Sequence, residues 1–241
     1  METDVDCCFF IYSGQFPSKW ETDLILYVSK ILVAMDKKVL MIDSTITQKA
    51  KYVVPVIKPT KAYVTDFEDI DVAVGFNTFD EIKEYLGIPA NGEFPYDIVM
   101  MDIDSPEAVR NFHVDNEGIN YFVTGFDQYT LKRGLEILSG LTEVLSLKKV
   151  LFSRTATKED NDYLDYLSLG YKIVWNEELV YFPLEMGDQT TIAENQKVAK
   201  IKFRKLTEQY KEGLIYIAEE ITGQDEYSKL KKVFKQLERN V

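Results

Sequence analysis

The chain has 241 residues, 46% of them hydrophobic and 28% charged, a balance typical of a globular domain rather than a disordered segment. Its net charge of −12 excludes a protein that grips nucleic acid with its whole surface, because phosphate binding needs clustered Lys and Arg. The sequence contains neither a secretory signal nor an apolar run of bilayer length, so we expect a cytoplasmic protein that meets a membrane only peripherally, at its inner face.

The first 43 residues predict a β-loop-α-β unit. Cys7–Tyr12 is a short apolar run, a loop containing Gly14 follows, and a helix-period segment leads to a second apolar run, Val39–Ile42, which ends in Asp43. In a parallel sheet such a unit places its loop at the carboxyl edge, beside the N-terminus of the helix, where free N–H groups favour an anion. The position suits a nucleotide phosphate.

The loop itself lacks most residues of a phosphate-binding loop of the Gly-x-x-x-x-Gly-Lys-Ser/Thr form. Gly14 and, loosely, Lys19 are retained. Phe16 stands where a glycine is needed, Pro17 has no N–H to donate, and Trp20 follows the lysine in place of a hydroxyl residue. The sequence therefore predicts a loop in the position of a phosphate-binding loop, without most of the residues that would bind the phosphate.

The rest of the chain alternates short apolar runs with helix-period segments. Tyr52–Ile57, interrupted by Pro55, predicts a loop or an edge strand. Further strands are expected at Asp71–Phe76, Asp97–Met101, Tyr121–Thr124, Val150–Phe152 and Lys172–Trp175. Helices are expected at Thr78–Leu86, Pro106–Phe112, Asp127–Leu145, Lys158–Leu167 and most of Thr191–Ile221. This order predicts an α/β fold, a doubly wound and mostly parallel sheet with helices on both faces, over residues 1–224.

Two strand-ending aspartates carry a family resemblance. Lys37–Asp43 (KKVLMID) and Pro95–Pro106 (PYDIVMMDIDSP), with the loop after Ser13, resemble the deviant Walker ATPases of the ParA/MinD family. The likeness covers residues 5–222 and implies a P-loop NTPase fold that dimerises. It implies that Asp102 is the magnesium-associated aspartate and that Asp43 positions water. The residues that it places around ATP and magnesium are Gly14, Gln15, Lys19, Asp43 and Asp102.

Departures from the family pattern point away from ATP turnover. Gln15 stands where the family carries a lysine that reaches the partner's phosphates, and a neutral amide cannot neutralise the charge that develops there. The strand at Val150–Arg154 ends in Ser153 and Arg154, where the family carries an asparagine that reads adenine. We therefore expect a pseudo-ATPase with a degenerate Walker A loop, in which binding of ATP and magnesium is weak or lost.

The resemblance then implies a positioning or assembly factor for a membrane-associated or pilus/secretion machinery, with the TadZ/CpaE-like branch as the nearest relative. It would act as a homodimer with a protein partner in a localised assembly. The alternative is an active ATP-dependent dimerisation switch in plasmid or chromosome partition, or in division-site placement. Magnesium-dependent ATP hydrolysis would distinguish the two.

Several residues also have a structural interpretation. Aspartates commonly end parallel strands and cap the next turn, so from spacing alone Asp43 and Asp102 fit that role as well as a catalytic one. Ser105 and Pro106 predict a helix start, with the serine as N-cap and the proline at the first helical position. His113, the only histidine, has no catalytic constellation around it in the sequence.

The adjacent Cys7 and Cys8 fall within the first predicted strand. Neighbouring side chains in a strand point to opposite faces, so a disulfide between them is not expected. The sequence also contains no zinc-type ligand spacing, and we expect no metal site of that kind.

Residues 225–241 predict a separate basic amphipathic helix. Five basic residues against one acidic residue give the stretch from Lys229 a charge of +4 in an acidic chain. It resembles the C-terminal membrane-targeting helix of the family. Contact with an anionic membrane and packing on protein are both open, whereas nucleic acid is not expected because aromatic platforms are missing. The residues expected to meet a membrane or a partner are Leu230, Lys231, Lys232, Val233, Phe234, Lys235 and Leu237.

Overall fold

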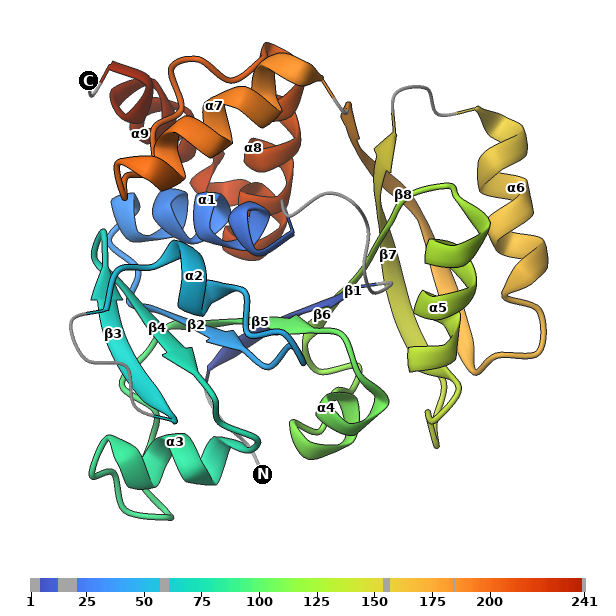
Figure 1. The fold of residues 1–241 in the computed structure, drawn as a ribbon, viewed down its shortest axis with the longest axis horizontal. Helices are drawn as coiled ribbons and strands as arrows, with labels where there is room; N and C mark the ends of the chain where they lie inside the picture. Colours follow the sequence, from blue (N-terminus) through green and yellow to red (C-terminus); the bar gives the residue numbers. More distant parts are fainter. Residues whose placement is uncertain (1–4, 13–20, 57–60, 154–156, 184, 240–241) are drawn as a thin grey trace.

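A computed structural model describes residues 5–12, 21–56, 61–153, 157–183 and 185–239. Gly14, Gln15 and Lys19, which the sequence places in the phosphate loop, lie outside these described residues. Within them an eight-stranded sheet crosses the molecule in the order β3-β4-β2-β5-β1-β6-β7-β8 (Figure 1). Only the pair β3 and β4 is antiparallel among the described strands, which confirms the predicted doubly wound, mostly parallel sheet.

The described strands are β1 (Asp6–Tyr12), β2 (Val39–Asp43), β3 (Tyr63–Phe67), β4 (Ile70–Val74), β5 (Ile98–Ile103), β6 (Ile119–Thr124), β7 (Leu145–Ser153) and β8 (Ile173–Pro183). The described helices are α1 (Glu21–Ala34), α2 (Ala50–Val53), α3 (Phe79–Tyr85), α4 (Pro106–Asn111), α5 (Gln128–Leu138), α6 (Lys158–Leu167), α7 (Met186–Lys197), α8 (Glu208–Thr222) and α9 (Tyr227–Arg239), with a short 3₁₀ turn, η1 (Gln224–Glu226), before the last.

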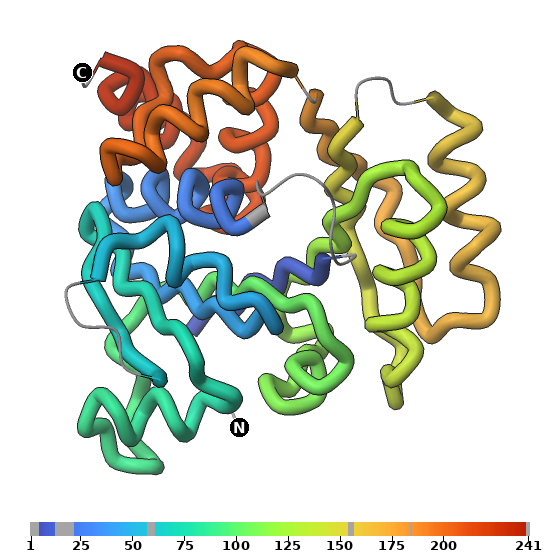
Figure 2. The backbone as a smooth tube through the Cα atoms, in the orientation of Figure 1, coloured from blue at the N-terminus to red at the C-terminus, as the bar shows by residue number. Residues whose placement is uncertain are grey.

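Helices cover both faces of the sheet (Figures 1 and 2). The side chains of β1 show how the faces separate. Cys8 and Phe10 belong to the core beneath α1, α8 and α9, whereas Phe9 and Ile11 belong to the core beneath α4 and α5. Cys7 packs against this second core and both thiols are free, so the prediction that Cys7 and Cys8 point to opposite faces is confirmed.

One sequence prediction was wrong in its bounds, and the structure refines two others. For the stretch expected as a loop or an edge strand, Tyr52 and Val53 end the single-turn helix α2, and residues 54–56 follow as a connection, as the loop alternative predicts. The helix expected over Asp127–Leu145 ends at Leu138, where Ser139 and Gly140 follow, and Leu145 already belongs to β7. Thr191–Ile221 is mostly helical, as predicted, and the connection at residues 198–207 divides it into α7 and α8.

One strand, β3, was missed. It forms a hairpin with β4 through a two-residue turn in which Glu68 and Asp69 both have positive φ, 57° and 68°. Positive φ at both positions is typical of a type I′ turn, which usually contains Asn or Gly. The Lys30 Nζ group donates to the Glu68 carbonyl oxygen at 2.8 Å and holds this turn against α1. The turn therefore depends on a tertiary contact that the local sequence does not reveal.

The C-terminal helix α9 packs against α1 and α8 (Figure 1). Leu230, Phe234 and Leu237 are buried in the same core as those two helices, and the Phe234 ring meets the Phe203 ring edge-on at 5.4 Å. Lys229 Nζ donates to the Met35 carbonyl oxygen at 2.9 Å. The apolar stripe of the tail is therefore part of the domain core. None of the described helices is long and apolar enough to cross a membrane.

Candidate functional site

The candidate site lies at the carboxyl edge of the sheet, where the parallel strands end. Asp43 ends β2 and is the Cα partner of Asp102 in β5. Both carboxylates project to the α1 side, because Met41 and Met100, two residues earlier in each strand, belong to the core under α1. Asp43 is 1% exposed and Asp102 is 0% exposed. The structure therefore brings together the two aspartates that the sequence singled out, and buries both.

Thr22, in the first turn of α1, donates its hydroxyl to Asp102 Oδ2 at 2.8 Å. A threonine hydroxyl beside a strand-ending aspartate is the type of pair that holds magnesium in phosphate-loop proteins. Sequence reasoning missed Thr22, because it looked for a hydroxyl directly after Lys19. The signal was present three residues later, where Thr22 opens the described part of the helix.

Asp43 is engaged by the chain that follows it. Its Oδ1 accepts hydrogen bonds from the Thr45 N–H at 3.0 Å and the Thr45 hydroxyl at 2.6 Å, and its Oδ2 accepts one from the Ala50 N–H at 2.6 Å. Burial raises the pKa of Asp43, while these hydrogen bonds and the charge of Lys49 oppose the rise. The carboxylate thus caps both ends of the segment 44–49, called here the β2–α2 loop.

Asp104, directly after β5, also binds the β2–α2 loop. Its Oδ1 accepts a hydrogen bond from the Ile46 N–H at 2.8 Å, and the Ser44 N–H donates to the Asp102 carbonyl oxygen at 3.0 Å. Burial raises the pKa of Asp104, and the Ile46 hydrogen bond and Lys49 oppose this rise. After Asp104, the predicted helix start is confirmed: Ser105 accepts a hydrogen bond from the Ala108 N–H at 3.2 Å, with a proline in the first turn.

Lys49 ends the β2–α2 loop. Its ammonium group is 5.9 Å from the centroid of the Tyr12 ring, at the carboxyl end of β1. Its charge opposes the rise in the pKa of Asp43, of Asp104 and of Asp23. The sequence analysis did not single out Lys49, because the loop that brings it to this edge is irregular.

Asp23 connects the site to α7. It follows Thr22 in α1, is 4% exposed, and accepts hydrogen bonds from Gln196 Nε2 at 3.0 Å to Oδ1 and 2.8 Å to Oδ2. Burial raises the pKa of Asp23 to about 7, against the opposing effects of the Gln196 hydrogen bond and of Lys49. A buried carboxylate with such a pKa changes charge near neutral pH.

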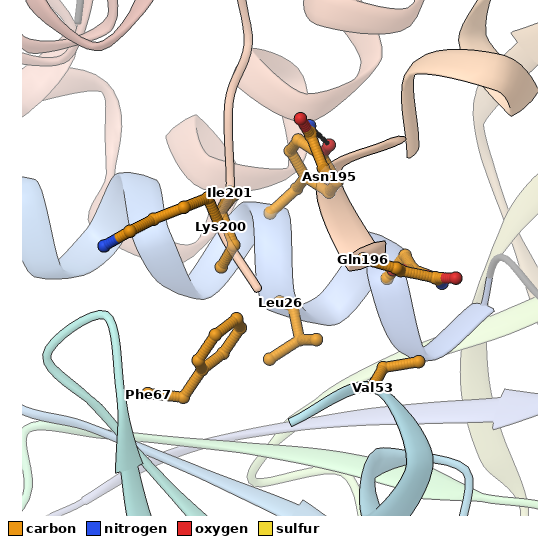
Figure 3. A pocket seen from close by; sticks show the side chains of 9 residues that line it. Leu26, Val53, Phe67, Asn195, Gln196, Lys200 and Ile201 are labelled. Atoms are coloured by element: carbon orange, nitrogen blue, oxygen red, sulfur yellow. Dashed lines mark hydrogen bonds between the residues drawn. The ribbon is translucent and has the colours of Figure 1, made fainter. Parts of the chain in front are cut away.

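A hollow with room for about one water molecule lies beside this contact, between α1, α2, β3 and α7 (Figure 3). Figure 3 shows Leu26 of α1, Phe67 of β3 and Val53 of α2 around it, with Gln196 of α7 and Lys200 just after that helix. The hollow is too small for a nucleotide. It is a small gap in the packing of α7 against α1, α2 and β3.

The described residues do not fit a divalent cation held between Asp43 and Asp102. Both oxygens of Asp43 carry hydrogen bonds from the chain, and Lys49 already brings a positive charge to this edge. No three His, Cys, Asp or Glu side chains within the described ranges are arranged to hold a metal ion. Among the described residues of this edge, the Thr22–Asp102 pair keeps the donor chemistry of a magnesium site.

The tail residues fall into two groups. Leu230, Phe234 and Leu237 are buried, and Val233 is partly buried against the same core. The basic residues expected to meet a partner, by contrast, are exposed on the outer side of α9: Lys231, Lys232 and Lys235. A contact made by α9 as it is packed here would therefore use its charges and not its apolar stripe.

Comparison with known proteins adds a fold assignment. No protein-family model matches the sequence, and no curated protein matches it. A ParA family ATPase from Chlorobium tepidum has a similar structure, with a TM-score of 0.57 at 14% identity over 90% of this chain and 98% of that one. A chain of the MinC:MinD cell division protein complex of Aquifex aeolicus gives a TM-score of 0.55 at 12% identity, over 91% of this chain and 96% of that one. A plasmid partition protein of Borrelia burgdorferi bound to AMPPNP gives 0.53 at 12%, over 96% and 99%. The fold is ParA/MinD-like.

Proposed function

We propose that this protein is a positioning or assembly factor of ParA/MinD-like fold that works without ATP turnover. The observation that carries the proposal is the engagement of Asp43, whose two oxygens accept three hydrogen bonds from Thr45 and Ala50. An aspartate used in this way is not available to position water or metal. Gln15, in place of the lysine expected by resemblance, points in the same direction.

The positioning role follows from the similar structures, whose names describe plasmid partition and cell division proteins. Among such proteins the TadZ/CpaE-like branch, which localises pilus or secretion machinery, is our assignment by resemblance. The alternative is an ATP-dependent dimerisation switch, and the Thr22–Asp102 hydrogen bond is the feature that favours it.

Calorimetry with ATP or ADP and magnesium, on full-length protein of known oligomeric state, tests the proposal. We expect no binding tighter than a Kd of roughly 1 mM, and no phosphate release. Thr22→Ala is the informative variant, because it removes a hydroxyl that donates to Asp102. Tight magnesium-dependent binding and turnover that Thr22→Ala abolishes would overturn the proposal in favour of the switch.

We also propose that the homodimer forms through the carboxyl edge. Two large apolar side chains of this edge point to solvent, Ile46 with 70% and Tyr52 with 79% exposure. An exposed apolar patch rimmed by polar residues is typical of an interaction surface. Light scattering should show a dimer for the wild type and a monomer for each of the variants Ile46→Asp and Tyr52→Asp.

The matched control for this dimer is Tyr166→Asp on α6, a tyrosine of similar exposure, 68%, away from the carboxyl edge. This variant should remain dimeric. A wild-type monomer, or a dimer that survives both edge substitutions, would refute the proposed interface while leaving the nucleotide experiment unaffected.

The tail is proposed as a second docking element, through the exposed lysines of α9. Removing residues 225–241 is a poor test, because it also removes Leu230, Phe234 and Leu237 from the core. Liposome sedimentation with anionic and neutral vesicles should instead compare wild type with the triple variant Lys231→Gln, Lys232→Gln, Lys235→Gln. Salt-sensitive binding to anionic vesicles that the triple variant loses would support membrane contact. Equal pelleting would leave a protein partner as the ligand of α9.

A further inference from the structure

Two helices far apart in the molecule carry charge of opposite sign. α6 lies at one end of the long, horizontal axis, and α9 lies toward the other (Figures 1 and 2). The ten residues of α6 include four acidic residues and one lysine, whereas the stretch from Lys229 in α9 has a charge of +4. Because these helices are far apart in one copy, a contact between them has to join two copies.

The inner side of α6 is fixed to the sheet. Leu164 is buried in the core beneath α4 and α5, and Lys149 Nζ of β7 donates to Asn161 Oδ1 at 2.7 Å and to Asp165. These contacts leave a stripe of exposed side chains, spaced three or four residues apart, on the outer side of the helix. This stripe, called the α6 outer face, consists of Glu159, Asp162, Tyr163, Tyr166 and, just beyond the helix, Leu169.

The α6 outer face combines carboxylates with aromatic rings. Glu159 and Tyr163 are four residues apart, as are Asp162 and Tyr166, so each pair is adjacent on the helix surface. Tyr166 is 68% exposed and Leu169 is 73% exposed. A lysine or arginine suits such a pair, because its charge can meet the carboxylate or the ring face while its aliphatic stem packs on the ring. The face therefore fits a basic partner surface.

α9 presents a surface of this kind. Its apolar stripe is buried, and Lys229 Nζ is used internally, donating to the Met35 carbonyl oxygen at 2.9 Å. Three other lysines of the helix are exposed and form the α9 outer face: Lys231, Lys232 and Lys235. Lys231 already makes the expected type of contact within the helix, since its Nζ lies 4.5 Å from the centroid of the Tyr227 ring.

We propose that the α9 outer face of one copy docks on the α6 outer face of a second copy, so that copies join head to tail. The contact uses two different surfaces, and its repetition builds a chain or a ring of copies. The inference rests on the proposed function, in that it names a second copy as the partner of the α9 docking element. It does not involve the carboxyl edge, where the dimer is proposed.

Charge reversal tests the contact. Sedimentation velocity is run on full-length protein in about 0.1 M NaCl, without lipid or nucleotide, over a range of protein concentrations. The α9 variant carries Lys231→Glu, Lys232→Glu and Lys235→Glu, and the α6 variant carries Glu159→Lys and Asp162→Lys. Wild type should increase in size with concentration. Each variant should lose this increase, or need a concentration at least roughly tenfold higher to show it.

A chain with all five substitutions separates the contact from a change in net charge. Its two faces are again opposite in sign, so it should recover the increase in size. The matched control is Asp80→Lys with Glu84→Lys, an exposed acidic pair on α3, which should behave as wild type. If a charge-reversed chain does not fold, Tyr166 decides the contact: Tyr166→Ala should weaken the association and Tyr166→Phe should keep it.

Salt separates this contact from the proposed dimer. In about 0.5 M NaCl the head-to-tail association should disappear, because exposed charge pairs are screened. Dimers should remain there; monomers would refute the carboxyl-edge dimer, while the series at low salt still decides this contact.

Three results at low salt would overturn the inference: wild type does not increase in size with concentration, the α6 variant associates as wild type does, or the chain with five substitutions does not recover the increase. Binding of the α9 lysines to anionic vesicles without any self-association would also overturn it, and would assign the α9 outer face to a membrane.

Discussion

Replacing Asp23 with asparagine should stabilise the protein above neutral pH. Burial raises the pKa of Asp23 from 3.8 to about 7, so between these values the folded protein binds a proton that the unfolded chain has released. The free energy of unfolding of wild type therefore falls as pH rises from about 4 to about 7, and is lowest above that window. The rise in pKa corresponds to about 4 kcal/mol, an upper limit for the gain in Asp23→Asn at about pH 8.

Urea unfolding of wild type and Asp23→Asn at several pH values measures this gain. The advantage of the variant should grow by about 2–3 kcal/mol between about pH 5 and about pH 8, since the asparagine oxygen can still accept from Gln196. Asp162→Asn, at an exposed position of α6, is the control and should follow wild type. A gain that does not depend on pH, or an Asp23→Asn variant that is less stable throughout, would refute the burial argument.

The same unfolding assay tests three further substitutions. Asp43→Ala should cost about 2–4 kcal/mol, because it leaves the donors of the β2–α2 loop without their acceptor; a loss no larger than that of Asp162→Ala would contradict this. Phe234→Ala should cost about 3–5 kcal/mol and Lys232→Gln less than about 0.5 kcal/mol, and equal effects would mean that α9 is not packed as described. Tyr210→Phe should be neutral or stabilise by up to about 1 kcal/mol, because the Tyr210 hydroxyl is buried and has no hydrogen-bond partner among the described residues.

Most of the fold could be predicted because its central strands are continuous apolar runs. The run that becomes β5 has an apolar residue at nearly every position, which only a strand covered on both faces can bury. What could not be predicted depends on contacts distant in sequence. The turn at Glu68 and Asp69 has no glycine or asparagine and is held by Lys30, and α2 is too short to show a helical period.

The candidate site was predicted in position but only partly in chemistry. Strand-ending aspartates are visible in a sequence, so Asp43 and Asp102 were found together. Their partners were not: no motif in the sequence marks Thr22, in the first turn of α1, and the backbone of the β2–α2 loop that reaches Asp43 is irregular. The tail was likewise recognised as amphipathic, whereas only the structure shows that α1 and α8 bury its stripe.

The bonds to Asp43 also limit what a ligand could do at this edge. A ligand shifts an equilibrium only by the difference in its affinity for the two states. To use Asp43, a magnesium nucleotide would first have to replace three hydrogen bonds to a buried carboxylate, at about 1.5–3 kcal/mol each. Under the proposed function, a loop with Gln15 where the family carries one of its lysines has less differential affinity to offset that cost. Under the proposed function these energetics favour a site closed by its own residues, and the surface to test is what this edge presents outward, beginning with Ile46 and Tyr52.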